Sequence, residues 1–76
     1  MSTSPDGQLV NLLSHWLARH RTDAELQEGI AAIGTEGLAA DQAELVEELA
    51  RELADGQSRG DLEMVARETL EALALG

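Results

Sequence analysis

Two histidines, His15 and His20, are the residues of this chain best suited to bind a metal ion or to move a proton. The two residues are five positions apart, so on one helix their side chains point about 140° apart. Two side chains in this arrangement could not chelate one ion together. We expect His15 to be exposed beside Asn11 and Arg19, and His20 to pack on the core near the helix end. Ser14 and His15 point about 100° apart, which excludes a nucleophile with its base.

Residues 55–66 bear a partial likeness to a calcium-binding loop between two helices. Asp55 would be the first ligand and Gly60 the glycine that such loops carry at the sixth position. Arg59, however, stands where the fifth ligand belongs, and Ala66 replaces the bidentate glutamate. We therefore interpret the segment as a connection between helices, and we expect no metal ion or cofactor in this protein.

A row of carboxylates is the stronger candidate for a binding surface. Its five members fall within an arc of about 80° on one expected helix. Like charges at i, i+4 destabilise an isolated helix by roughly 0.2–0.5 kcal/mol per pair, so stability alone would favour mixed signs. The row predicts a docking face for a basic partner or a mimic of a row of phosphates, and a solvated outer face is the alternative. Its members are Asp41, Glu44, Glu48, Glu52 and Asp55.

A second candidate surface is apolar. Met64 and Leu75 lie eleven residues apart, and therefore on one face of the last expected helix, among Glu68 and Glu71. Methionine is a common contact residue at adaptable interfaces, whereas scattered apolar side chains also occur on ordinary surfaces. We expect this pair to contact a partner or a second copy of the chain, with an ordinary surface as the alternative.

Four amphipathic helices must position these residues. Four short segments carry apolar residues at i, i+3, i+4 and i+7, the pattern of one buried helix face. The sequence predicts an all-α fold, a compact bundle of four short helices at about 5–20, 22–33, 41–54 and 61–75. It predicts one domain over 5–76, preceded by a disordered N-terminus over 1–4. The expected core residues are Leu9, Leu12, Leu13, Trp16 and Leu17; Leu26, Ile30 and Ile33; Leu45, Val46, Leu49 and Leu53; and Leu62, Val65, Leu70 and Leu73.

Capping signals set the expected helix starts. Thr22 followed by Glu25 has the form of a capping box. Asp41 is expected to cap the third helix, and either Ser58 or Asp61 the fourth.

Composition narrows the class of partner. The 76 residues include 15 acidic and 5 basic side chains, for a net charge of −10. This charge argues against binding to nucleic acid or to an anionic membrane, and it favours a basic partner. The chain has no cysteine, which fits a cytoplasmic location, and its apolar stretches are too short to span a bilayer.

These features predict a non-enzymatic protein–protein interaction module: an adaptor, an accessory subunit or a regulator. A chain of this size buries only about 60% of its surface, so we expect a homodimer or a hetero-complex. Trp16, the sole aromatic residue, is expected to anchor the core. The alternative function is an acidic inhibitor that mimics nucleic acid and occupies a basic groove of a target protein.

Overall fold

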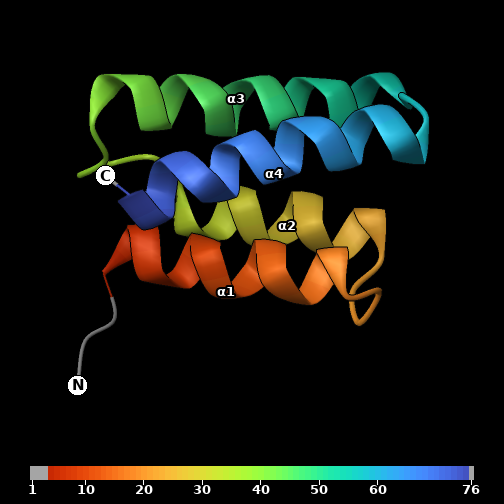
Figure 1. Ribbon diagram of the computed structural model, residues 1–76, viewed down its shortest axis with the longest axis horizontal. Coiled ribbons are helices and arrows are strands. Elements are labelled where there is room, and N and C mark those ends of the chain that lie inside the picture. The colour runs from red at the N-terminus through yellow and green to blue at the C-terminus, as the bar shows by residue number, and fades with distance from the viewer. Residues whose placement is uncertain (1–3, 76) are drawn as a thin grey trace.

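Four antiparallel helices make up the computed structural model, which describes residues 4–75 (Figure 1). The chain runs up and down, and the last helix returns beside the first, so that each helix packs on two neighbours. Over the described residues there is no strand, and the predicted all-α bundle is confirmed. The helices are α1 (Pro5–Leu17), α2 (Asp23–Ile33), α3 (Ala40–Asp55) and α4 (Arg59–Leu75).

The predicted disorder at the N-terminus falls mostly on residues 1–3, which lie outside the described residues, as does Gly76. Ser4 is described, and its carbonyl accepts a hydrogen bond of 3.0 Å from the Gln8 N–H. Ser4 therefore stands in extended backbone directly before α1 and takes part in its first turn.

Two of the predicted caps are confirmed. Thr22 Oγ1 accepts from the Glu25 N–H at 3.1 Å, and Glu25 Oε1 accepts from the Thr22 N–H at 2.9 Å, a complete capping box. At α4, Ser58 is the cap: its hydroxyl donates to Asp61 Oδ2 at 3.0 Å and accepts from the Asp61 N–H at 3.4 Å. Because Ser58 is the cap, α4 begins at Arg59, two residues before the predicted start.

The predicted cap of α3 is wrong. The helix begins at Ala40, and Asp41 lies inside its first turn. Gln42 supplies the bond that matters, because its Oε1 accepts from the Ala39 N–H at 3.0 Å. Its Nε2 donates to the Ala72 carbonyl at 3.1 Å, which ties the start of α3 to the end of α4. Gln42 is thus a buried polar residue that is satisfied at both ends.

The first helix ends at Leu17, three residues before the predicted His20. The backbone reverses at Arg19, whose φ of 66° is in the left-handed region. The Arg19 N–H donates to the Trp16 carbonyl at 3.0 Å, and the His20 N–H donates to the His15 carbonyl at 2.8 Å. This pair of bonds is a Schellman motif, which closes a helix and usually places glycine where Arg19 stands.

The third helix ends in the same way, with glycine at the critical position. Gly56 has a φ of 75°, its N–H donates to the Leu53 carbonyl, and the Gln57 N–H donates to the Glu52 carbonyl. The sequence signalled this stop through its glycine, whereas Arg19 gave no such signal.

All four helices contribute to one core. Trp16 is fully buried, as predicted, and most of the expected apolar residues are buried with it or pack half-buried against it. On α4 the pattern does not predict Thr69 as a core residue, yet it is buried, and its hydroxyl is satisfied by donating to the Val65 carbonyl at 2.7 Å. The buried apolar residues are Leu9, Leu13, Trp16, Leu26, Ile30, Val46, Leu49, Leu53, Leu62, Ala66 and Leu73.

One end of the bundle is held by a polar cluster around Trp16. Its indole N–H donates to Asp23 Oδ1 at 2.9 Å. Arg59 packs its guanidinium over the indole ring, 3.9 Å from the centroid, and donates from Nη2 to the Trp16 carbonyl at 2.8 Å. Arg59 also donates from Nε to Glu63 at 2.9 Å and lies 3.5 Å from Asp23. The cluster joins α1, α2 and α4.

Candidate protein-interaction surface

The five predicted carboxylates lie along the outer side of α3. Asp41, Glu44, Glu48 and Asp55 are exposed, and Glu52 is half-buried. None of them forms an ion pair with another residue in the described range 4–75. The inner side of the same helix is occupied by the buried residues Gln42, Val46, Leu49 and Leu53, so the row is free of any part in the core.

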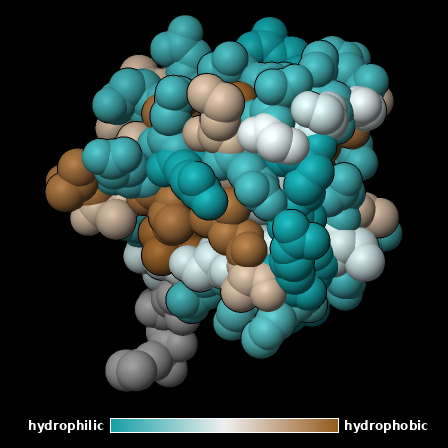
Figure 2. Space-filling view, turned by 45° about the vertical axis from the view of Figure 1, so that its right-hand side comes forward, coloured by the Kyte–Doolittle hydropathy of each residue, from teal (hydrophilic) through white to brown (hydrophobic). Residues whose placement is uncertain are grey.

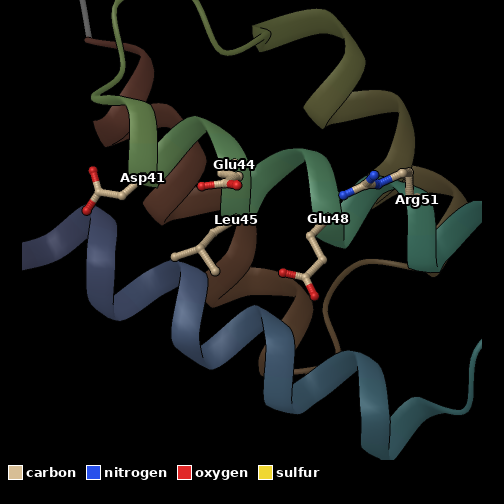
Figure 3. A pocket seen from close by; sticks show the side chains of 5 residues that line it. All are labelled: Asp41, Glu44, Leu45, Glu48 and Arg51. Carbon is tan, nitrogen blue, oxygen red and sulfur yellow. The ribbon is translucent and has the colours of Figure 1, made fainter.

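Three of the five carboxylates line one open hollow of about 380 Å³. Asp41, Glu44 and Glu48 share it with Leu45 and Arg51 (Figure 3). Glu52 and Asp55 lie further along α3 and outside it. All five lining residues belong to α3, and Figure 3 shows the Leu45 and Glu48 side chains on the side of α3 that faces α4.

Leu45 is the residue of this surface that sequence reasoning placed wrongly. It was predicted to join the core, but it is half-buried and lines the hollow. Its successor Val46 points about 100° away around the helix and takes the core position together with Gln42. The helical period could have identified the core positions of α3, because the buried residues 42, 46, 49 and 53 follow i, i+4, i+7 and i+11. The pattern was not recognised because its first member, Gln42, is polar.

The lowered pKa values among the described carboxyl groups have structural causes. The backbone N–H of Thr22 lowers the pKa of Glu25, and the hydrogen bond from Arg59 lowers that of Glu63. The Ser4 hydroxyl likewise lowers the pKa of Asp6. Each of these groups stays ionised at neutral pH, whereas a general acid requires a raised pKa.

The second predicted surface consists of two separated side chains. Met64 is 65% exposed and Leu75 is 81% exposed. Eleven residues of helix place them about 16 Å apart along the axis of α4, and the exposed Glu68 and Glu71 lie between them in the chain. Figure 2 shows a face that is mainly hydrophilic, with hydrophobic residues gathered from its left edge to its centre.

One of the two histidines departs from the prediction. His15 is exposed, as expected, but His20 is exposed too and does not pack on the core. The turn at Arg19 removes His20 from the helix and brings its ring parallel to that of His15, with 6.5 Å between centroids and 15° between planes. No cluster of three or more side chains that could hold a metal ion occurs among residues 4–75.

The segment resembling a calcium loop is used differently. Arg59 turns inward to Trp16, and Asp61 is engaged by the Ser58 cap. Arg59 therefore joins α4 to α1 and α2, whereas Asp61 takes part in the cap at the start of α4.

Comparisons with family models, with curated proteins and with solved structures find no match to this chain. In the part of the chain that the structure describes, no helix has the length and apolar character needed to cross a bilayer.

Proposed function

We propose that this protein is a non-enzymatic interaction module that docks a basic protein partner on the outer side of α3. The observation that carries the proposal is the hollow, in which the half-buried Leu45 is flanked by Asp41, Glu44 and Glu48. A partner that places an apolar side chain over Leu45 and cations beside the carboxylates would match both the shape and the charge of this surface.

The open form of the hollow favours a macromolecular partner over a substrate. Its charged lining residues are exposed to solvent, whereas substrate sites are mostly apolar and enclose their ligand. The carboxylates follow one another at about 4.5–6 Å along the helix axis, a spacing that a row of lysine or arginine side chains could meet.

The composition of the hollow favours a protein partner over mimicry of nucleic acid. A phosphate mimic needs an uninterrupted row of negative charges, but Leu45 and Arg51 stand among these carboxylates. A basic groove shaped for a phosphate backbone would gain little from the apolar Leu45.

A charge reversal at Glu48 tests the proposal. Glu48→Lys should weaken partner binding, mainly through slower association, and this loss should shrink at high salt because salt screens the charges. The free protein should become more stable by roughly 0.2–0.5 kcal/mol, since Glu48 has like-charged neighbours at Glu44 and Glu52. The matched control is Glu28→Lys on the exposed side of α2, because both variants change the net charge from −10 to −8.

The assay is quantitative affinity capture from native lysate, followed by binding measurements on each recovered protein at two salt concentrations. Proteins that are lost with Glu48→Lys and retained with Glu28→Lys are the expected partners. Recovery of one identical set by the wild type and both variants would end the docking proposal and leave a solvated helix face.

A neutral change at Leu45 separates the two kinds of partner. Leu45→Gln leaves every charge in place and removes only the apolar contact. Loss of binding with Leu45→Gln supports a protein partner, whereas full binding combined with loss in Glu48→Lys supports the phosphate mimic instead.

Self-association through α4 is the remaining part of the proposal. Met64 and Leu75 are the exposed large apolar residues that a second copy could cover. Sedimentation over a wide concentration range should reveal a dimer that Met64→Glu with Leu75→Glu dissociates, and a wild type that stays monomeric throughout would remove this part.

A further inference from the structure

The turn that ends α1 brings two metal-binding side chains together. His15 lies in the last turn of the helix and His20 lies just beyond the left-handed Arg19. Both side chains are exposed, and their ring centroids are 6.5 Å apart. From this juxtaposition we infer that His15 and His20 form a two-imidazole site for a late first-row divalent metal ion, with Ni²⁺, Cu²⁺ and Zn²⁺ as the class.

The backbone holds the two residues in register. The His20 N–H donates directly to the His15 carbonyl at 2.8 Å, and the Arg19 N–H closes the turn on Trp16. The spacing of the two Cα atoms is therefore set by hydrogen bonds and does not depend on a flexible loop. Such preorganisation lowers the entropic cost of binding both rings to one ion.

The ring separation is close to that of a chelate. A metal–nitrogen bond of about 2.1 Å places an imidazole centroid about 3.2 Å from the ion, so two centroids in a tetrahedral site lie about 5 Å apart. The observed 6.5 Å exceeds this by about 1.5 Å, and rotation of two exposed side chains can close the difference. Water would fill the other coordination positions.

The electrostatic setting favours a cation. The carbonyl end of α1 carries the negative end of the helix dipole. The net charge of −10 attracts metal cations over longer range. Arg19 and Arg21 flank His20 in the chain. The charge of Arg21 is partly offset by Glu25, whose carboxylate lies 3.6 Å from its guanidinium. Imidazole is a ligand that Cu, Ni and Zn prefer, whereas Mg²⁺ and Ca²⁺ prefer oxygen.

The test is a calorimetric titration of the full chain with NiCl₂ at pH 7.5. The wild type should bind one ion, and His15→Ala and His20→Ala should each weaken binding by about tenfold or more, because each leaves a single imidazole. Arg19→Gly keeps the turn and both rings, so it should bind as tightly as the wild type. Glu28→Gln, at an exposed position of α2 outside both candidate surfaces, should do the same.

A spectroscopic measurement locates the ion. In a two-dimensional NMR spectrum, substoichiometric Cu²⁺ should broaden the signals around residues 15–21 before any others, and Ca²⁺ should leave them unchanged. Equal Ni²⁺ affinity in the wild type and in either single histidine variant would overturn the inference, as would broadening that begins at α3.

Discussion

Replacement of Arg59 by methionine should destabilise the bundle more than any other change of an arginine. Arg59 is the only described arginine that contacts three helices, through the ring and carbonyl of Trp16, through Asp23 and through Glu63. Methionine keeps an unbranched apolar stem that can still cover the indole, so the variant removes the charge and the hydrogen bonds and little of the packing.

The expected loss follows from the two contacts with Trp16. A hydrogen bond from a charged group contributes about 1.5–3 kcal/mol, and a cation–π contact at an exposed site about 0.5–1 kcal/mol. Because the Arg59 side chain is 33% exposed, solvent reduces the first of these. We expect a net loss of about 2 kcal/mol out of a total of roughly 4–11 kcal/mol for a domain of this size. The melting temperature should then fall by roughly 8–16 °C.

Thermal unfolding followed by circular dichroism measures this loss, with Trp16 fluorescence as a local probe. Arg67→Met is the matched control, because Arg67 is exposed and lies on the same helix. Arg59→Lys should fall between the wild type and Arg59→Met, since an ammonium keeps the charge without the planar fork. If Arg59→Met and Arg67→Met melt within 2 °C of each other, the cluster at Trp16 does not hold this end of the bundle.

The same variant makes a prediction about pH. The hydrogen bond from Arg59 holds the pKa of Glu63 below its ordinary value of 4.5. A carboxyl group with a lowered pKa stabilises the folded state above pH 4.5, and this contribution disappears as the pH falls through the lowered value. The difference in melting temperature between the wild type and Arg59→Met should therefore narrow as the pH is taken below 4.5.

Three further predictions concern backbone positions. Arg19→Gly should raise the free energy of unfolding by up to about 1 kcal/mol in chemical denaturation, because a left-handed φ is strained for arginine. Gly56→Ala, at the equivalent turn after α3, should lower it by about 1 kcal/mol or more for the same reason. A destabilised Arg19→Gly would mean that the arginine side chain outweighs the strain. A methyl group at Gly29 would lie 2.5 Å from Leu12 Cδ2, so Gly29→Ala should be more favourable by about 1–2 kcal/mol when Leu12 is also alanine. A double-mutant cycle without coupling would show that Leu12 moves aside freely.

The helices could be predicted because their signals are local. The apolar period and the Thr22 capping box involve residues within a few positions of each other, and both describe the structure well. The errors arise where a distant group decides. Gln42 replaces an apolar core residue because the Ala72 carbonyl, thirty positions away, accepts its amide hydrogen bond. The sequence predicts Arg59 only as part of a connection between helices, since its partner Trp16 lies 43 positions earlier.

The end of α1 shows a different kind of limit. Its stop depends on a left-handed arginine, a conformation that residue type does not signal. The missed stop changed the interpretation of His20, because a continuous helix would have turned it about 140° from His15 and against the core. With Arg19 in a helical conformation the two histidines could not bind one ion. With Arg19 in the left-handed conformation their rings lie 6.5 Å apart.

The row of acidic residues predicted the candidate surface on α3, but the hollow around Leu45 is seen only in the structure. Gln42 makes the side-chain hydrogen bond at the start of α3, so Asp41 does not cap the helix and its carboxylate is exposed. On α4, Arg59 and Glu63 show that this chain does pair opposite charges at i, i+4. The described residues offer no such pairing to Glu44 or Glu48, which face solvent on either side of Leu45. An unpaired row of like charges weakens the isolated helix slightly, and none of its carboxylates has an ion-pair partner among residues 4–75. It is therefore the surface on which stability and binding should respond in opposite directions to Glu48→Lys.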